Sequence, residues 1–309
     1  MPVSLETDLL LDRRRLKRRL FVWRSLTVIA VLGAVLVALR GAHVAVGGAH
    51  VERLTISGII SDNSKLNEAI NKLADNGSVK ALIVAIDSPG GSVAGGEGLH
   101  DAIARIAVKK PVVAVMGGTA ASAGYMIAVP AERIFAREAT LTGSIGVLLE
   151  TGEVSGLLGK IGISTDAIVS GPLKDQPSFT KPTSPEGRQV LQALVMDMYD
   201  QFVGMVATGR HMDPARVREL ADGRAYTGHQ ALKLGLVDQI GDEHDAREWL
   251  AKTKGVSADL PVDDLSTDSL SGRLFSSSIG WVVDSIWKSL FSQGVMLDGA
   301  WALWQRSGN

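Results

Sequence analysis

Ser122 has neighbours that are compatible with a catalytic role for its hydroxyl group. It follows Met-Gly-Gly-Thr-Ala-Ala at residues 116–121 and precedes Ala-Gly-Tyr at residues 123–125. This pattern predicts a buried strand that ends in glycines and a serine that opens a helix, whose dipole favours developing negative charge. A serine at this place is also an ordinary helix N-cap, and the Gly-x-Ser-x-Gly spacing of the nucleophile elbow is absent. The motif alone leaves the two interpretations equal.

A second loop, Asp-Ser-Pro-Gly-Gly-Ser at residues 87–92, follows another apolar run. A Pro-Gly-Gly turn exposes backbone N–H groups that no side chain crowds, and such groups form oxyanion holes. It is not a phosphate-binding loop, because no Lys-Ser or Lys-Thr pair follows the glycines. An ordinary turn between a strand and a helix has the same composition, and the turn by itself favours that simpler interpretation.

Short apolar runs alternate with amphipathic stretches around these loops. We expect strands at 53–60, 81–86 and 111–116, and helices at 63–76 and from the glycine loop to about 108. The run at 81–86 is apolar throughout, as in a strand buried on both faces. This alternation predicts right-handed βαβ units in a layered α/β domain. Further helices should begin at Ser184-Pro185 and at Asp213-Pro214, where a capping residue precedes a proline.

The N-terminal region has the pattern of a membrane anchor. Residues 13–19 carry six positive charges, and residues 20–39 are mostly apolar. At about 1.5 Å per residue the apolar run reaches roughly 30 Å, the thickness of a bilayer core. We therefore expect a cytoplasmic basic segment at 1–19, a single-pass anchor in the cytoplasmic (inner) membrane at 20–40, and everything after Arg40 on the periplasmic or extracytoplasmic side. A signal peptide cleaved near residues 42–45 is the alternative.

Residues 50–254 contain the whole α/β pattern and form the predicted catalytic domain. Residues 255 to about 271 are rich in Ser and Asp and are interpreted as a linker. The rest, to residue 309, is apolar again and contains four of the six tryptophans, as in an amphipathic tail. The tail is expected to lie against the bilayer or a neighbouring subunit, or else to pack on its own domain.

Composition excludes several classes of protein. The net charge is −1, so nothing in the overall balance indicates nucleic-acid binding. The chain has no cysteine, which rules out cysteine nucleophiles, disulfides and thiolate metal sites. The six histidines show no metal-binding spacing. We expect neither a metal nor another cofactor.

The two loops and three further motifs, in this order and at these spacings, resemble bacterial signal peptide peptidase A. The resemblance extends from about Leu54 to Ile240 and implies the half-length, single-repeat type. The matching blocks are Ser-Pro-Gly-Gly at 88–91, Ala-Ala-Ser-Ala-Gly-Tyr at 120–125, Thr-Gly-Ser-Ile-Gly-Val at 142–147, Leu-Lys-Asp at 173–175 and Gly-Arg-Ala-Tyr-Thr-Gly at 223–228. The implied fold is the spiral of ββα units that this family shares with Clp protease and the crotonases.

The resemblance also implies the roles of the site residues. Ser122 would be the nucleophile and Lys174 its general base, with Ser144 holding the lysine in place. The backbone N–H groups of Gly91 and Ala123 would form the oxyanion hole. Each copy of the chain would hold a whole Ser–Lys pair, and the copies would form a ring of about eight.

A lysine base also fits the residue types. No histidine lies between His100 and His211. A lysine can act as a base only when its pKa falls from about 10.4 toward neutrality, which burial can achieve. Lys174 on its own would be an ordinary solvated lysine; the family pattern favours it over Lys160 and Lys181.

The predicted function is therefore that of a membrane-anchored serine endopeptidase that hydrolyses apolar remnants of signal peptides. Its expected partners are these peptides, the lipid bilayer and further copies of the chain. One alternative is a crotonase-like enzyme acting on acyl-CoA, although such enzymes normally lack an anchor. The other is a catalytically silent membrane scaffold with the same fold.

Overall fold

The computed structural model describes residues 48–265 together with Trp23, Thr27, Ala30, Val31 and Gly33, which are helical. Residues Gly47–Thr267 form one compact unit. The predicted basic segment, most of the predicted anchor and the predicted tail lie outside the described residues. Within the described part of the chain, no helix has both the length and the hydropathy needed to cross a bilayer.

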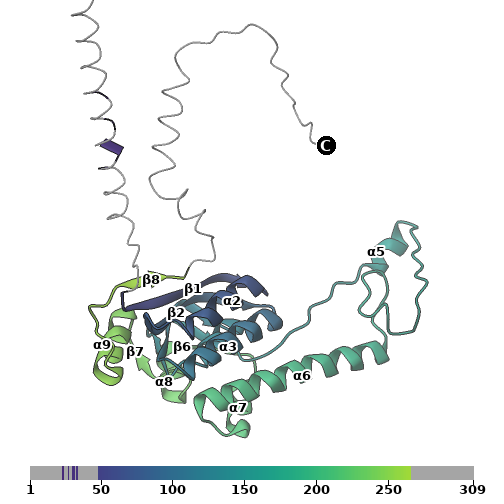
Figure 1. The fold of residues 1–309 in the computed structure, drawn as a ribbon. Coiled ribbons are helices and arrows are strands. Elements are labelled where there is room, and N and C mark those ends of the chain that lie inside the picture. Colours follow the sequence, from purple (N-terminus) through teal and green to yellow (C-terminus); the bar gives the residue numbers. More distant parts are fainter. Residues whose placement is uncertain (1–22, 24–26, 28–29, 32, 34–47, 266–309) are drawn as a thin grey trace, which may run out of the picture. The chain divides into compact units, whose positions relative to one another are not determined.

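One sheet of eight strands organises the compact unit (Figure 1). Its main path runs in the order β6-β5-β3-β2-β1-β8, and β4 and β7 extend it from β3. All pairs are parallel except β5 with β6. The strands are β1 (His50–Ile60), β2 (Val79–Gly91), β3 (Val112–Ala121), β4 (Arg133–Ala136), β5 (Leu141–Gly143), β6 (Ala225–Thr227), β7 (Gln239–Ile240) and β8 (Val262–Asp264).

Helices cover both faces of the sheet, and the α/β class predicted from the sequence is confirmed. α2, α3 and α4 pack in a larger core on one face, and α9 packs in a smaller core on the other. The described helices of the compact unit are α2 (Ser64–Leu73), α3 (Val93–Ala107), α4 (Ala123–Ala128), α5 (Ser155–Lys160), α6 (Pro185–Arg210), α7 (Pro214–Leu220), α8 (Gly228–Leu234) and α9 (Glu243–Lys254).

β2 shows how the apolar sequence produces the two cores. Leu82, Val84 and Ile86 belong to the larger core, whereas Ala81 and Ile83 belong to the smaller one. Successive side chains of a strand point to opposite faces, so an uninterrupted apolar run is needed when both faces are covered. The predicted burial of this strand on both faces is confirmed.

β2 and β3 are longer than the sequence pattern predicts. β2 continues to Gly91 and β3 to Ala121, through residues interpreted above as loops. The ladder shifts register here: Ile86 pairs with Met116, but Ser88 pairs with Ala120. A bulge therefore keeps the glycines within the sheet, although their composition is that of a turn.

Residues 145–184, here called the arm, leave the sheet, form α5 at the far end and return to the start of α6 (Figure 1). With 26 residues, α6 is about 39 Å long. Its last turns pack into the larger core through Phe202, Val203 and Val206. Its first turn packs on the arm instead, where the side chain of Gln176 lies against Gly187. The arm thus stands at the end of α6 that lies away from the core.

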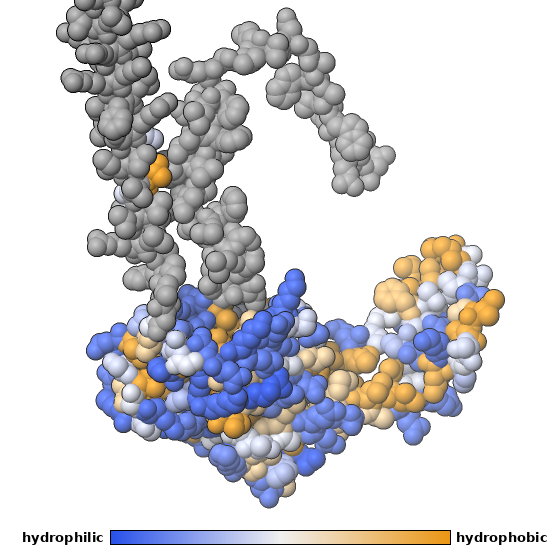
Figure 2. Space-filling model, viewed as in Figure 1, coloured by the Kyte–Doolittle hydropathy of each residue, from blue (hydrophilic) through white to orange (hydrophobic). Residues whose placement is uncertain are grey.

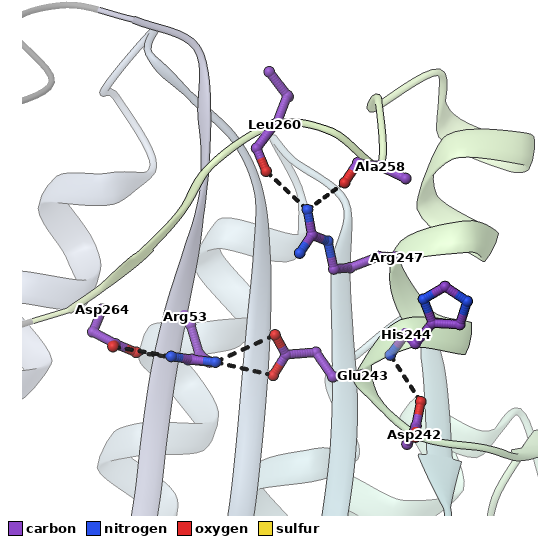
Figure 3. A network of polar contacts seen from close by, with 8 residues as sticks. All are labelled: Arg53, Asp242, Glu243, His244, Arg247, Ala258, Leu260 and Asp264. Carbon is purple, nitrogen blue, oxygen red and sulfur yellow. Dashed lines mark hydrogen bonds and ion pairs between the residues drawn. The ribbon is translucent and has the colours of Figure 1, made fainter. Parts of the chain in front are cut away.

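The C-terminal part of the described chain is fastened to β1 by charged side chains (Figure 3). Arg53 donates to Asp264 at 2.6 and 3.0 Å and to Glu243 at 3.3 Å. Arg247 donates to the carbonyl groups of Ala258 and Leu260. β8 lies within the stretch interpreted as linker, so the compact unit extends past residue 254. A three-residue edge strand with two acidic residues has no apolar pattern that would reveal it.

A mostly buried ion pair joins α6 to the segment before β7. Arg210 donates to Asp238 at 2.5 and 3.0 Å and to the carbonyl of Gly235 at 3.1 Å. The Arg210 side chain is 7% exposed and that of Asp238 is 26% exposed. Removing one member of a buried pair leaves the other charge desolvated without its partner.

We therefore expect Arg210→Met to lower the free energy of unfolding by about 2–4 kcal/mol. Arg218 provides the control, because its ion pair with Asp200 is half exposed on both sides. Arg218→Met should cost less than about 1 kcal/mol. Urea unfolding followed by circular dichroism measures both, and equal losses would contradict the structural role of the buried pair.

Candidate active site

Ser122 lies at the junction of β3 and α4, with φ 54° and ψ −122°. Positive φ is uncommon for a residue with a Cβ and costs on the order of 1–3 kcal/mol. Two hydrogen bonds hold the turn: the Ser122 amide donates to the Gly143 carbonyl at 2.9 Å, and the Ser122 carbonyl accepts from the Met126 amide at 3.0 Å. The backbone therefore makes a sharp strand-to-helix turn of the nucleophile-elbow kind, although the usual glycine spacing is absent.

The Ser122 hydroxyl does not cap the helix that it precedes. Ser92 and Ser184 do act as caps, since their hydroxyls accept from the Gly95 and Gly187 amides at 3.1 and 2.9 Å. Ser122 Oγ has no hydrogen-bond partner among the described residues, and the residue is only partly buried. The bond on which the N-cap interpretation depends is thus missing, and the hydroxyl is available for chemistry.

Two glycines bring the end of β2 against Ser122. Gly90 has φ +116°, and a Cβ there would lie 2.8 Å from Ser122 Cβ and 3.2 Å from Ser122 Oγ. At Gly91 a Cβ would lie 1.9 Å from the Ile60 carbonyl oxygen. Since real Cβ atoms do not approach so closely, only glycine fits both positions.

The backbone amides of Gly91 and Ala123 lie in the two segments that meet at Ser122. The Ser92 amide donates to the Ile60 carbonyl of β1 at 2.9 Å. Because successive amides of an extended strand point to opposite sides, the Gly91 amide points away from β1, toward the side of β3 and Ser122. The Ala123 amide opens α4, and the first amides of a helix have no partner within it. Gly91 thus directly follows the glycine that packs on Ser122, and Ala123 directly follows Ser122 itself; their role as oxyanion donors stays a prediction.

Ser144 also borders the site. Gly143 and Ser144 have φ values of 75° and 47°, which turn the chain sharply at the end of β5. The Gly143 carbonyl binds the Ser122 amide, and the Ser144 amide donates to the Arg224 carbonyl at 3.0 Å. The backbone of Ser144 is thereby held in place directly after Gly143, the residue that binds the Ser122 amide.

Among the predicted site residues, Lys174 is the one that lies on a separate part of the described protomer. It lies in the arm between α5 and α6 and is exposed. No hydrogen bond or ion pair joins its side chain to another described residue; its amide donates to the Gly171 carbonyl at 3.1 Å. The arm joins the start of α6, which lies about 26 Å along the helix from Phe202, its first residue in the larger core (Figure 1).

A hollow of about 340 Å³ lies elsewhere, lined by the middle of β1, β2 and β3 and by the start of α9. Asp87, Arg137 and Glu243 are among its lining residues, and none of the predicted site residues is. Across residues 48–265, no three or more His, Asp or Glu side chains gather closely enough to hold a metal ion. The hollow is therefore separate from Ser122 and from the other predicted site residues.

Two residues that contact Ser122 were not among the site residues predicted from the sequence. Gly90 touches the Ser122 side chain, and Gly143 binds the Ser122 amide. Both are glycines with positive φ inside motifs quoted above. The motifs marked these positions, but the strand packing that gives each glycine its role is not visible in the sequence.

A partly exposed hydroxyl without a hydrogen-bond partner among the described residues, at the start of a helix, is suited to acyl transfer, because nearby backbone amides can stabilise an oxyanion that forms on attack. The sequence model of peptidase family S49 matches residues 104–257. The Clp protease model matches residues 52–142, which carry β1 to β5 and the serine.

Curated relatives agree with the family match. A Synechocystis sp. protein provisionally named as a protease is 42% identical over 211 residues, covering 68% of this chain and 76% of the relative. An Enterococcus faecium protein provisionally named as signal peptide peptidase SppA is 37% identical over 258 residues, covering 78% and 73%. Protease 4 of Salmonella typhi is 40% identical over 205 residues, covering 63% of this chain and 33% of the relative. The chain belongs to peptidase family S49 and is an SppA-like serine peptidase.

Gly90→Ala tests the contact between β2 and the serine. The new methyl group would displace the Ser122 side chain, and a displacement of about 1 Å costs roughly 100-fold in rate. Gly255 is the control, since it also has positive φ (68°) but no atom within 4 Å of an added Cβ. Peptide turnover should collapse in Gly90→Ala and persist in Gly255→Ala. Equal turnover in both variants would show that the contact does not matter.

Proposed function

We propose that this protein is a membrane-anchored endopeptidase in which Ser122 attacks the peptide bond and Lys174 of a neighbouring copy acts as its base. The observation that carries the proposal is the unbonded Ser122 hydroxyl beside the amides of Gly91 and Ala123. The family match supports peptide hydrolysis at this hydroxyl over crotonase chemistry on a thioester.

The reaction follows from these groups. Lys174 Nζ takes the hydroxyl proton as Ser122 Oγ bonds to the substrate carbonyl carbon, and the Gly91 and Ala123 amides bind the resulting oxyanion. Collapse breaks the C–N bond, and the lysine returns the proton to the leaving amine. Water then attacks the acyl-enzyme with the lysine again as base, which releases the acid and restores the serine.

The lysine is assigned to a neighbouring copy because the arm that carries it lies away from the core of its own protomer. Lys174 is exposed at the far end of α6, without a side-chain partner among the described residues. The family resemblance implies a pair within one copy, whereas the described protomer leaves its lysine and its serine on separate parts of the fold. A second copy that accepts the arm would place the lysine near a serine and shield it from water.

Exposed apolar side chains support such an assembly. Figure 2 shows hydrophobic residues gathered over the arm and the adjoining part of α6. Ile168 is fully exposed and Leu148 is 80% exposed. Contiguous apolar surface of this kind is typical of protein–protein contacts. Other large apolar residues exposed there are Leu149, Leu157, Ile161, Ile163, Val169, Leu173, Phe179, Val190 and Leu194. A closed ring, for which the sequence predicted about eight copies, would bury them.

Co-expression separates the shared site from a site within one chain. Ser122→Ala and Lys174→Ala should each abolish acylation by a peptide substrate. Lys174→Arg should fail equally, because guanidinium stays protonated near neutral pH. Differently tagged Ser122→Ala and Lys174→Ala chains, co-expressed and purified through both tags, should regain activity, since some neighbours then combine an intact serine with an intact lysine.

Lys160→Ala and Lys181→Ala are the controls and should keep most of the turnover. Mixed assemblies without activity would assign the lysine to the serine of its own chain. Retained acylation in a folded Lys174→Ala protein would remove this lysine as the base. Retained hydrolysis in Ser122→Ala would overturn the proposed function itself.

The proposed anchor is the apolar run at residues 20–40, preceded by the basic cluster. The proposed substrates are apolar remnants of signal peptides, which the provisional name of the Enterococcus faecium relative supports. An anchored peptidase would meet such peptides where they are released.

The topology can be tested with two reporters fused after Asn309. A reporter that is active only outside the cytoplasm should give signal, and one that is active only in the cytoplasm should not. Replacing the six basic residues at 13–19 by uncharged ones should weaken this bias. Signal from the cytoplasmic reporter in the unmodified chain would contradict the proposed orientation.

A further inference from the structure

Ser88 is a buried polar residue in the last part of β2, after its apolar run at residues 81–86. It is 0% exposed, and its hydroxyl donates to the Gly58 carbonyl of β1 at 2.6 Å. The same hydroxyl accepts from the Gly90 amide at 3.1 Å. One side chain therefore ties the glycine turn beside the active serine to the neighbouring strand.

These two bonds lie at a bulge in the ladder. Ser57 pairs with Asp87 and Ile59 with Gly90, so Ser88 and Pro89 together oppose the single residue Gly58. The extra residue of a bulge interrupts the regular ladder and leaves backbone groups that need other partners. The Ser88 hydroxyl supplies the missing partner for the Gly90 amide.

The direction of the Gly91 amide depends on this arrangement. The Gly90 amide is held by Ser88 Oγ, and the Ser92 amide is held by the Ile60 carbonyl of β1. With the amides on either side of it fixed, the Gly91 amide between them must point the other way, toward Ser122. Without the Ser88 hydroxyl, only one of the two flanking bonds remains.

Ser88 also contacts the helix that carries the nucleophile. An added Cβ at Gly124 would lie 3.0 Å from the Ser88 carbonyl oxygen and 3.6 Å from Ser88 Cβ. Ser88 thus lies next to both the glycine turn and α4, the two segments that carry the predicted oxyanion donors.

We propose that Ser88 is a positioning residue for the reaction at Ser122: its hydroxyl fixes the Gly90–Gly91 peptide so that the Gly91 amide meets the developing oxyanion. This inference rests on the proposed function. Ser88 does not touch the substrate and acts through Gly90. Its loss should therefore reduce the rate of acylation and leave substrate binding nearly unchanged.

Thr140 provides a matched control for a merely structural role. It is 1% exposed, and its hydroxyl likewise donates to one carbonyl (Gly117, 2.7 Å) and accepts from one amide (Arg137, 3.0 Å). Ser88→Ala and Thr140→Val both remove a buried hydroxyl with two bonds. Comparable losses of thermal stability are expected from the two variants.

The experiment measures the acylation burst and the steady-state kcat and KM of the purified full-length protein in detergent, with an activated ester of a short apolar peptide. Ser88→Ala should lower the burst rate and kcat about 10- to 100-fold with little change in KM, somewhat less than deletion of an oxyanion donor. Thr140→Val should keep the wild-type burst rate. A wild-type burst rate in folded Ser88→Ala, or an equal loss in Thr140→Val, would overturn the proposal.

If Ser88→Ala does not fold, Ser88→Cys tests whether the Ser88 hydroxyl positions the Gly91 amide. A thiol is close in size to the hydroxyl and is only a weak donor, so an intermediate burst rate is expected. A wild-type rate in Ser88→Cys would then contradict the proposal. Ser122→Ala serves as the separate test of the function: a burst that persists there overturns the proposed mechanism, whereas a normal burst in the Ser88 variants overturns only this inference.

Discussion

The site depends on the close contact between the end of β2 and Ser122. Gly90 leaves no space for a Cβ beside the serine side chain, and Gly91 leaves none beside the Ile60 carbonyl. These contacts set the distance between the hydroxyl and the amides around it. They also require that β2 and β3 remain strands through their glycines, which the bulges and buried hydroxyls make possible. Glycine is needed here because a Cβ would not fit between the two chain segments.

The unfavourable backbone of Ser122 is held by its surroundings. All six residues of α4 are buried, and the Ser122 amide is bound by β5. Strain on the order of 1–3 kcal/mol persists only where neighbouring structure determines the conformation. The same packing that stabilises the domain therefore fixes the direction of the hydroxyl. The Tyr125 hydroxyl, which donates to the Leu236 carbonyl at 2.8 Å, contributes to this anchoring, and burial raises the pKa of that phenol.

The arm is attached to the domain less closely than the residues around Ser122. It is attached to the domain through a long helix whose last turns alone enter the larger core, and it exposes many apolar side chains. Exposed apolar surface of this extent is typical of interaction sites. Under the proposed mechanism, assembly would both cover this surface and deliver the lysine. Stability of the domain and completion of the catalytic pair would then be separate events.

The sequence alone determined the α/β class, the strand buried on both faces, the capped helices at Ser184 and Asp213, and the loops that surround Ser122, because each depends on local composition or periodicity. The tertiary structure decided what depends on contacts between distant segments. It showed that the glycine loops are strand ends and that Gly90 and Gly143 touch the serine. It also showed that β8 pairs with β1 although its residues resemble a linker. It also placed the arm, and Lys174 with it, at the end of α6 away from the core. The length and packing of that helix determine this position. The separation of 52 residues between Ser122 and Lys174 in the sequence does not reveal it.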